Sequence, residues 1–556
     1  MRGIDLHVHS TCSDGTNTPA ELVELALAKN LKAIALTDHD TIDGLDEILS
    51  CAKNKDLEIV PGIELSTEYF GRDIHMLGLY INPCHPEFLA HLEKFRESRD
   101  NRNRKMCELL AQQGIDITYE SLVAEFPDSV LTRSHYACYL LSHGYVKSRK
   151  EAFERYVGDH CKAFVPREKI TPMDAIRLIR VAGGIPVLAH PILYRLSDAT
   201  LDKMVAELKE AGLMGIEGVY STYAPSEERY IKRLAAKYDL LVTGGSDYHG
   251  GNKPDIQLGN GRGSLFVPEE LLDRLKEAYL SKYNNPKANS AILFFDLDGT
   301  LLNDEKTISP LTRETLENCV KAGHRFAISS GRPLASIRKL VDRLHLEDLN
   351  PLASSFNGSL VYDYETGKNL MECRLSTDIV EKVRNLISPQ GIHCHSYSES
   401  EILSEKETPE LLFYAKYVNL PYRLVDNLSA PGEEPYKMLI VTLDNRQLLE
   451  DLKIQLEEIL GDRVQCLLSN DMFLEVLPAN SGKGAALTFL CEHYGISKEH
   501  SFAFADAEND ISMLREARYG VCLLNGQKNA LAAADYVTFT DNNHEGLVPY
   551  LKKLLP

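Results

Sequence analysis

No stretch of this sequence approaches the roughly 18 consecutive apolar residues that a membrane-spanning helix requires. The chain reaches Asp5 and His7 without a preceding apolar segment, so we expect neither a signal peptide nor contact with a membrane. The sequence also lacks a C-x-x-C motif, and its twelve cysteines are scattered singly. That pattern indicates free thiols in a reducing compartment, which favours the cytoplasm.

Basic residues are scarce relative to acidic ones. The chain has 61 Lys and Arg against 81 Asp and Glu, which gives a formal net charge of −20. This balance argues against sequence-independent binding to long nucleic acid, which needs a basic surface. Small phosphorylated substrates remain compatible with it, because bound metal ions can supply positive charge locally.

At 556 residues the chain is too long for one hydrophobic core, so we expect at least two domains. Residues 281–290 read SKYNNPKANS, a polar segment with proline and three asparagines that is typical of a linker. We therefore predict a first domain over 1–282, a linker over 283–290 and a second domain over 291–556.

The first half begins with an H-x-H pair, His7 and His9, behind a short apolar lead. On a strand, residues two apart point to the same face, and two imidazoles aimed at one point suit a metal ion. Short apolar runs at 33–36, 57–60, 185–189 and 240–243 then alternate with helical stretches. This alternation predicts a parallel sheet or barrel.

Each of these apolar runs leads into a His, Asp or Glu. In an α/β barrel the carboxyl ends of the strands meet at one face, so these side chains are expected to converge there. His75 does not follow the rule, because its apolar run comes after it. The residues that do follow it are His7, His9, His39, Glu64, His190, Asp247 and His249.

The segments DLHVHSTCSDG, LTDHDT, PGIELS, IHMLG, VLAHP and SDYHG resemble the PHP (polymerase and histidinol phosphatase) family in order and spacing. The resemblance implies a distorted β/α barrel that holds up to three metal ions. It implies one ion bound by His7, His9, Glu64 and Asp247, a second by Glu64, His75 and His190, and a third by Asp14, His39 and His249. Asp38 and Asp40 would support a ligand instead of binding metal.

Nitrogen and carboxylate ligands without thiolate suit Mn²⁺, Fe²⁺ or Zn²⁺. Two such ions about 3.5–4 Å apart can supply a hydroxide near neutral pH, which would attack phosphorus in line. The expected chemistry of the first domain is therefore hydrolysis of a phosphate ester.

Residues from about 95 to 170 interrupt the barrel pattern with helical segments, beginning with a charged helix over 93–113. This insertion resembles the lid of the PHP subgroup that includes RNase AM, whose members act on nucleoside 3',5'-bisphosphates and on the 5' ends of short RNA. Arg133 and His135 are our candidates for binding a second phosphate. For Arg133, a surface salt bridge is the alternative.

In the second half, the apolar run 291–295 ends in Asp296-Leu297-Asp298-Gly299-Thr300. Two carboxylates at a buried strand end repel each other unless a cation binds or one of them is protonated, and Mg²⁺ with a phosphate substrate meets that need. Three further motifs follow along the chain, namely SSGRP at 329–333, GKG at 482–484 and DAEND at 506–510.

These motifs resemble the Cof-type phosphatases of the haloacid dehalogenase (HAD) superfamily. The resemblance implies that Asp296 is the nucleophile, that Asp298 is the general acid and base, and that Ser330 and Lys483 bind the phosphoryl group. Mg²⁺ would be held by Asp296, the Asp298 carbonyl and Asp506, with Asp510 and Asn509 close by. Ala505 and Ala507 stand where the family usually has glycine, which puts the loop geometry in question.

The hundred or so residues from about 374 to 475 mix strand and helix signals, and they resemble an α/β cap of the type IIB group on a Rossmann-like HAD core. The leading interpretation is an α/β protein that is a bifunctional phosphohydrolase of nucleotides or short RNA and of a phosphomonoester. Two alternatives stay open. The PHP domain could be a histidinol-phosphate phosphatase, or one domain could sense a ligand and regulate the other. The sequence leaves the oligomeric state open.

Overall fold

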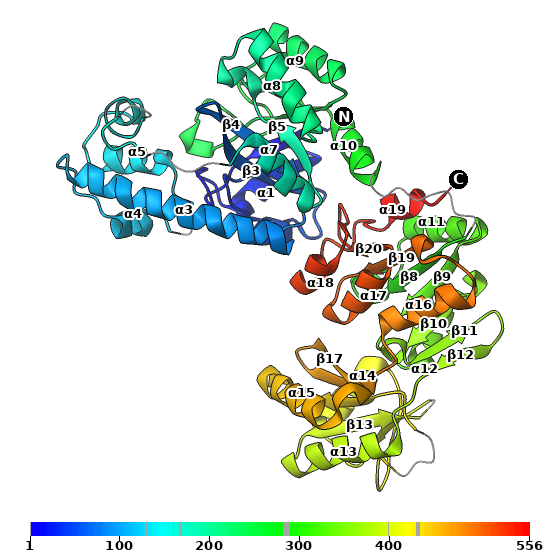
Figure 1. Cartoon of the computed structure of the whole chain (residues 1–556). Helices are drawn as coiled ribbons and strands as arrows, with labels where there is room; N and C mark the ends of the chain where they lie inside the picture. The colour runs from blue at the N-terminus through cyan, green and yellow to red at the C-terminus, as the bar shows by residue number, and fades with distance from the viewer. Residues whose placement is uncertain are drawn as a thin grey trace. The chain divides into compact units, whose positions relative to one another are not determined.

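A computed structural model of the chain describes residues 2–127, 130–158, 161–165, 170–281, 290–398, 400–429 and 434–555. The chain divides into two compact units, residues 1–282 and 283–556, which are described separately (Figure 1). The expected linker lies outside the described residues except for Ser290. The twelve cysteines are all described, and each is a free thiol. None of the described helices is both long enough and apolar enough to cross a bilayer.

The first unit is built on a seven-stranded sheet whose spatial order follows the sequence. Neighbouring strands are parallel, except that β4 runs antiparallel to both β3 and β5. The backbone N–H of His9 donates to Tyr248 O at 3.0 Å, and this bond joins the end of β1 to the segment after β7, so the sheet curls into a nearly closed barrel. The strands are β1 (Ile4–Val8), β2 (Ala33–Leu36), β3 (Glu58–Tyr69), β4 (Arg72–Leu79), β5 (Ile185–Leu188), β6 (Gly215–Tyr220) and β7 (Leu241–Gly245).

Amphipathic helices connect the strands and pack on the barrel. In α8, Leu201, Met204, Val205 and Leu208 are buried, which is the i, i+3, i+4, i+7 spacing of one helix face. Capping boxes at Thr18 and Thr171 begin α1 and α7, each with proline in the first turn. The helices are α1 (Pro19–Ala28), α2 (Leu45–Ala52), α7 (Pro172–Val181), α8 (Asp198–Glu210), α9 (Pro225–Lys237) and α10 (Glu270–Ser281).

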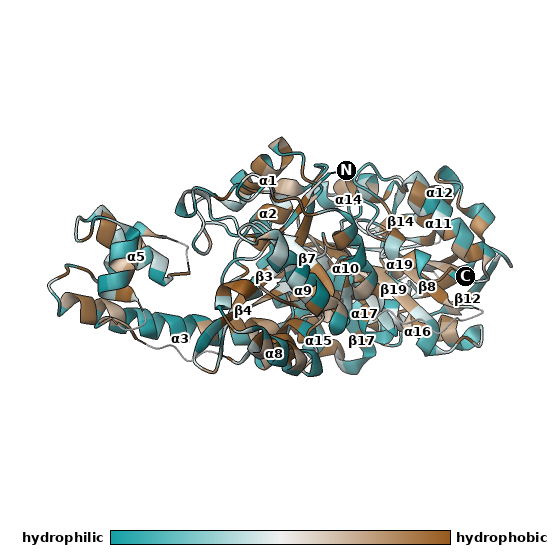
Figure 2. Ribbon diagram, turned by 90° about the horizontal axis from the view of Figure 1, so that it is seen from above, coloured by the Kyte–Doolittle hydropathy of each residue, from teal (hydrophilic) through white to brown (hydrophobic). Residues whose placement is uncertain are grey.

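Between β4 and β5 the chain forms a helical insertion with an apolar cluster of its own, separate from the cluster under the barrel helices. Its helices are α3 (Pro86–Ala111), α4 (Tyr119–Glu125), α5 (Arg133–Ser142) and α6 (Arg149–Ala152), followed by a π-helical turn over Phe153–Val157. Helix α3 is hydrophilic over much of its length (Figure 2). It begins seven residues before the expected start at 93, because Pro86 occupies its first turn.

The second unit has an eight-stranded core sheet in the order β12-β11-β10-β9-β8-β19-β20-β21. The six strands from β10 to β21 are mutually parallel, and β11 and β12 form an antiparallel edge. The strands are β8 (Ile292–Asp296), β9 (Arg325–Ser329), β10 (Leu352–Ser355), β11 (Leu360–Asp363), β12 (Lys368–Glu372), β19 (Ser501–Ala505), β20 (Tyr519–Cys522) and β21 (Tyr536–Val537). The helices are α11 (Pro310–Lys321), α12 (Leu334–Arg343), α16 (Lys483–His493), α17 (Ile511–Glu516), α18 (Lys528–Ala533) and α19 (Val548–Lys552).

A second sheet of this unit, in the order β15-β14-β13-β16-β18-β17, carries three helices and has its own apolar cluster. We call residues 377–478 the cap. Its strands are β13 (His393–Tyr397), β14 (Ile402–Ser404), β15 (Tyr422–Leu424), β16 (Met438–Val441), β17 (Val464–Asn470) and β18 (Phe473–Pro478). Its helices are α13 (Thr377–Ile387), α14 (Pro409–Val418) and α15 (Arg446–Leu460). The last cap strand ends three residues beyond the expected boundary at 475.

Phe88, near the start of α3, is fully buried in the barrel's apolar cluster, whereas Phe70 at the β3–β4 turn is 87% exposed. We expect Phe88→Ala to lower the free energy of unfolding of the first unit by about 3–5 kcal/mol, through lost burial and a residual cavity. The control Phe70→Ala should change it by less than about 0.5 kcal/mol. Urea denaturation followed by circular dichroism measures both, and equal effects would contradict this packing.

Candidate active sites

The nine predicted metal ligands of the first unit come together at the end of the barrel where the parallel strands finish. Seven of them were expected from the strand-end rule, and the position of His75 is explained by the direction of its strand. Because β4 runs antiparallel, His75 lies opposite Ser66 near the carboxyl end of β3. The backbone N–H of Ala189, just after β5, donates to His75 O at 3.1 Å. The apolar run after His75 therefore leads away from the site.

The buried carboxylate of Glu64 is the centre of this group. One oxygen, Oε2, is close to three imidazole nitrogens, and the other, Oε1, is close to two more. The distances from Oε2 are 3.3 Å to His7 Nε2, 3.2 Å to His9 Nε2 and 3.2 Å to His39 Nδ1, and those from Oε1 are 2.9 Å to His75 Nδ1 and 3.0 Å to His190 Nε2.

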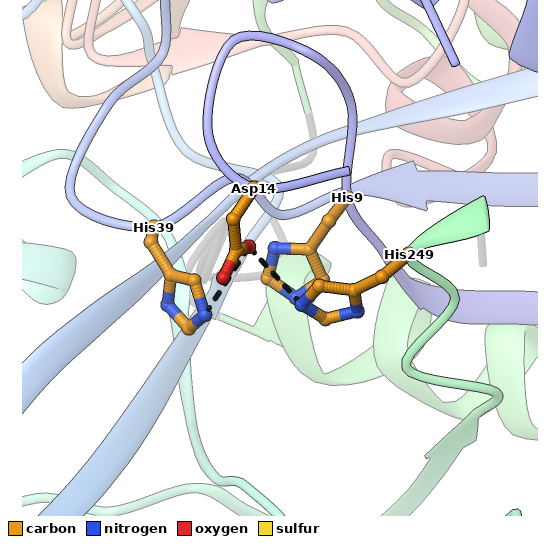
Figure 3. A group of neighbouring side chains, drawn as sticks. All are labelled: His9, Asp14, His39 and His249. Carbon is orange, nitrogen blue, oxygen red and sulfur yellow. Dashed lines mark ion pairs between the residues drawn. The ribbon is translucent and has the colours of Figure 1, made fainter. Parts of the chain in front are cut away.

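Asp14 belongs to a neighbouring group with His9, His39 and His249, whose ligand atoms all lie within 4.8 Å of one another (Figure 3). Asp14 Oδ1 is 3.1 Å from His249 Nε2 and 3.8 Å from His39 Nε2. Asp247 Oδ1 lies 3.6 Å from His7 Nε2 and 3.4 Å from His9 Nε2. The three ligand sets predicted from sequence therefore lie next to one another in one buried cluster of imidazole and carboxylate side chains.

Several donor atoms of this group are buried without a hydrogen-bond partner, namely His7 Nε2, His9 Nε2, His39 Nδ1 and Asp14 Oδ1. A buried polar atom left without a partner costs about 1–3 kcal/mol, so such atoms normally have one. Because these nitrogens and oxygens face one another, cations between them would satisfy all four. The donor set therefore fits metal ions that prefer imidazole and carboxylate.

The imidazoles also set the charge of the central carboxylate. Burial raises the pKa of Glu64, but the neighbouring histidines, led by His39 and His7, outweigh it and hold the pKa well below its usual range. For Asp247, burial likewise raises the pKa, and Lys253 and the histidines bring it well below the ordinary value. Both carboxylates are therefore ionised at neutral pH, as ligands must be.

Glu217 was missed by the sequence analysis. It lies within β6 and is fully buried. Its Oε1 is 3.1 Å from His7 Nδ1, and its Oε2 accepts from the backbone N–H of His190 at 2.8 Å. A carboxylate on the far nitrogen of a ligand histidine fixes the ring orientation and its tautomer. A single charged residue inside an otherwise apolar strand was the only available signal.

Other carboxylates near the site are bound by the chain itself. Asp38 accepts from the backbone N–H of Ser10 at 2.8 Å, and Asp40 accepts from the backbone N–H of Ser66 at 2.8 Å and pairs with Arg99. Neither belongs to a group of described residues with metal-binding geometry.

A cavity of about 760 Å³ opens beside the predicted metal ligands. One part of its lining is Asp14, His39 and His75, and the insertion contributes Arg99, Arg102, Arg133 and Phe164. Arg133 Nη2 lies 3.5 Å from Asp73 Oδ2, and its guanidinium lies 5.7 Å from the centre of the Phe164 ring. Arg133 therefore lines the cavity, and its pair with Asp73 is also consistent with the alternative of a surface salt bridge, so its contact with substrate stays a prediction.

His135 is placed differently from Arg133, and it is not among the residues that line the cavity. It is the third residue of α5, and its Nδ1 accepts from the backbone N–H of Thr132 at 2.9 Å in a capping box. Burial lowers the pKa of His135 to about 4, so the ring is neutral at physiological pH. This placement puts His135 at the helix start, and its contact with a second phosphate stays a prediction.

In the second unit, the motif residues meet at the carboxyl ends of β8, β9 and β19. Asp296 ends β8, and Lys483 begins α16. Lys483 Nζ is 2.6 Å from Asp296 Oδ1 and also contacts Asp510. Asp296, Asp506 and Asp510 form a group with the geometry of a cation site.

This group has more negative charge than its lysine can balance. Burial, reinforced by Asp510, raises the pKa of Asp506 to about 7, and the same two causes raise the pKa of Asp296. Like charges that are buried together disfavour ionisation, and a divalent cation would relieve that cost. Carboxylate oxygens are the ligands that Mg²⁺ prefers, so these residues fit it.

The general-acid candidate Asp298 lies outside that group and forms ion pairs with two basic side chains. Its Oδ2 accepts from Arg332 Nη2 at 2.7 Å, and its Oδ1 accepts from Lys306 Nζ at 2.8 Å. Burial raises the pKa of Asp298, but Arg332 and Lys306 bring it below the usual value. Ser330 Oγ accepts from the backbone N–H of Arg332 at 3.2 Å, which orients the loop after β9.

The glycine of DLDGT is required by geometry. Gly299 has φ +88°, and a Cβ there would lie 2.4 Å from Asp506 Oδ2. The two alanines beside Asp506 carry no such demand, since Ala507 is extended with φ −118° and Ala505 is an ordinary strand residue. The departure from the family pattern at 505 and 507 therefore introduces no backbone strain.

Replacing Glu217 by glutamine should weaken metal binding in the first unit by about 10- to 100-fold, because the His7 ring loses its charged partner. Titration with Mn²⁺ against a chelator measures this affinity. Glu68→Gln is the matched control, because Glu68 lines the same cavity but is exposed. Equal affinities of the two variants would contradict the orienting role.

The pKa of His135 also makes a testable contribution to stability. Because an unfolded histidine titrates near 6.5, the unfolded chain binds more protons than the folded one between pH 6.5 and 4. The stabilisation is complete above pH 6.5 and is lost as the pH falls toward 4. Between pH 7 and 5, His135→Gln should lose about 2 kcal/mol less stability than the wild type. Urea denaturation of wild type and His135→Gln at pH 7 and pH 5, both in the presence of a metal chelator, measures the two free energies of unfolding. Identical losses of stability in the two proteins would contradict the lowered pKa of His135.

Comparison with known proteins assigns both units. Residues 5–168 match the PHP domain family, and residues 293–551 match the haloacid dehalogenase-like hydrolases. The chain is 38% identical over 245 residues to a 5'-3' exoribonuclease of Haemophilus influenzae, which covers 44% of this chain and 89% of that protein. It is 31% identical over 251 residues to a 3',5'-nucleoside bisphosphate phosphatase of Chromobacterium violaceum, which covers 45% and 88%.

A third relative is the 5-amino-6-(5-phospho-D-ribitylamino)uracil phosphatase of Bacillus subtilis, which is 28% identical over 284 residues and covers 47% of this chain and 96% of that protein. With the site geometry, these matches confirm the two resemblances seen in the motifs. The chain therefore belongs to the PHP family in its first unit and to the haloacid dehalogenase-like hydrolases in its second, and it is a bifunctional phosphohydrolase.

Proposed function

We propose that the first unit hydrolyses nucleoside 3',5'-bisphosphates or the 5' ends of short RNA, and that the second is a Mg²⁺-dependent phosphomonoesterase. The cavity of the first unit is the observation that carries this proposal. It places metal-ligand residues and several arginines around one space of about 760 Å³, which suits a substrate with two phosphates. The names of two relatives, an exoribonuclease and a bisphosphate phosphatase, support the same substrate class.

In this proposal the nine residues at the barrel end hold up to three ions of Mn²⁺, Zn²⁺ or Fe²⁺ in the three predicted sets. When bound, such ions supply a hydroxide nucleophile and neutralise the phosphate. Glu217 orients the His7 ring, and Tyr220 and Lys253 each donate to Asp247 Oδ2 at 2.6 Å and fix that carboxylate. Arg133 contacts the phosphate that is not cleaved.

In the second unit, Asp296 Oδ attacks phosphorus and forms an aspartyl-phosphate, while Asp298, which is protonated once the bound substrate has displaced Arg332 and Lys306 from it, donates that proton to the departing oxygen. Asp298 then takes a proton from water, which attacks the same phosphorus and releases phosphate and free Asp296. Lys483 and Ser330 stabilise the charge on the phosphoryl group, and Asn509 contacts the substrate. Asp296, Asp506, Asp510 and the Asp298 carbonyl hold Mg²⁺.

Small phosphorylated compounds or short RNA are the partners in this proposal, and long nucleic acid is not, given the net charge of −20. The cytoplasm is the proposed location, and twelve free thiols support it.

The first experiment uses the Asp296→Asn chain, in which only the first unit can act. With Mn²⁺ and adenosine 3',5'-bisphosphate, we expect release of phosphate and formation of AMP. If metal is bound but no phosphate is released, the substrate class is wrong, and histidinol phosphate becomes the compound to assay.

Within the same background, Arg133→Ala should lower kcat/KM for the bisphosphate by about 10- to 100-fold, the usual value of a charge-assisted hydrogen bond. A phosphomonoester substrate should be affected far less. Arg104→Ala is the matched control, because Arg104 is an exposed arginine of the same insertion that pairs with Glu120. Equal losses on both substrates would contradict the second-phosphate role.

A further inference from the structure

Two charged residues of the cap, Lys437 and Glu475, are buried against the catalytic loops of the second unit. Their side chains are 1% and 4% exposed, and Lys437 Nζ is 2.8 Å from Glu475 Oε2. Lys437 precedes β16 and Glu475 lies on the adjacent strand β18. Burying a lysine and a glutamate away from water is costly unless each is paired and hydrogen-bonded. Their contacts therefore show what this pair does.

Lys437 bonds to the loop that carries Ser330. Its Nζ donates to the carbonyl oxygen of Gly331 at 2.7 Å, so the cap fixes the residue that follows Ser330. The ammonium also lies 5.4 Å from the centre of the Tyr397 ring, which belongs to the cap. Lys437 thus connects the cap sheet to the phosphate-binding loop after β9.

Glu475 is linked to the second catalytic loop, residues 506–510, through Asn357. Its Oε2 accepts from Asn357 Nδ2 at 2.9 Å, and its Oε1 accepts from Ser469 Oγ at 2.8 Å. Asn357 in turn accepts from Asn509 Nδ2 at 3.2 Å, and its backbone N–H donates to Ser330 O at 3.0 Å. Glu475 is therefore two hydrogen bonds away from Asn509 in the loop that also holds Asp506 and Asp510.

The glycine at 331 makes this approach possible. A Cβ there would lie 3.2 Å from Asn357 Oδ1 and 3.3 Å from Glu475 Oε1, which is tighter than normal packing. Asn357 also has φ +52°, a left-handed conformation that non-glycine residues adopt rarely, so its amide is held in place by its partners.

We propose that Lys437 and Glu475 are positioning residues through which the cap orders the two catalytic loops, so that the core has its full activity only with the cap docked. The inference rests on the proposed phosphomonoesterase activity of this unit. The pair does not touch the reacting atoms. It acts through the Gly331 carbonyl on Ser330 and through Asn357 on the loop of Asn509. Misplacement of catalytic groups by about 1 Å can cost roughly 100-fold in rate.

The test is steady-state hydrolysis of p-nitrophenyl phosphate with Mg²⁺ by the full chain, after subtraction of the rate of the Asp296→Asn chain. Lys437→Met keeps the length of the side chain but removes the charge and the donors. We expect kcat to fall about 100-fold with KM changed by less than about threefold, and we expect Lys437→Arg to recover part of the loss. Circular dichroism below the unfolding transition establishes that each variant is folded.

Lys339→Met is the matched control, because Lys339 is a core lysine that donates to a cap carbonyl, Asn419 O at 2.8 Å, at the exposed side of the same interface. It should keep kcat within about twofold.

If Lys437→Met does not fold, the isosteric Glu475→Gln gives the same test, with an expected loss of kcat of about tenfold. A folded variant of Lys437 or Glu475 with unchanged kcat would overturn the inference. A raised KM at constant kcat would also overturn it, because Lys437 would then contact substrate. Absence of Mg²⁺-dependent turnover in the wild-type chain would contradict the proposed activity itself.

Discussion

Buried charge that only other buried groups can balance is the constraint on which both sites depend. In the barrel, one carboxylate, Glu64, has five imidazole nitrogens within 3.3 Å, and these nitrogens come from strands that are far apart in sequence. Cations would complete such a cluster, since unpaired buried donors and charges are costly. The fold supplies the geometry, because parallel strands that close into a barrel bring their carboxyl ends to one place.

The second unit meets the same constraint with different means. Asp296 and Asp510 both contact Lys483, and Asp506 lies beside them, so one lysine leaves an excess of negative charge that a divalent cation would balance. A cap covers the loops that hold these aspartates. The buried Lys437–Glu475 pair links that cap to the loops. In this unit the cap is therefore bonded to the loops that carry the catalytic residues. In the first unit, by contrast, the helical insertion packs around its own apolar cluster.

Much of this arrangement could be predicted from sequence, because strand ends and short motifs carry local signals. His75 could be predicted only through the family resemblance, since no periodicity reveals that β4 is antiparallel. Glu217 and Glu475 were missed because each is a lone charge within an apolar strand, and its partners are assembled only by the tertiary fold. For His135, the sequence alone did not separate a role at the helix start from a phosphate contact, and the contact stays a prediction. Helix α3 begins earlier than the charged stretch predicts, because Pro86 starts the helix before the charged residues are reached.

Helix α3 connects the barrel to the helical insertion that carries Arg133. Its 26 residues form a rod of about 39 Å. Phe88 and Leu92 embed one end in the barrel cluster, the Arg99–Asp40 pair fastens its middle to the strand β3 through Ser66, and Met106 and Leu110 belong to the insertion. Beyond Arg99 the insertion is tied to the barrel again, since the backbone N–H of Val130 donates to Cys12 O at 3.0 Å and Arg149 Nη1 donates to Asn252 Oδ1 at 2.9 Å. Arg133, which also pairs with Asp73 of β4, is therefore held by both the insertion and the barrel, so the width of the cavity between Arg133 and the predicted metal ligands depends on both parts of the unit.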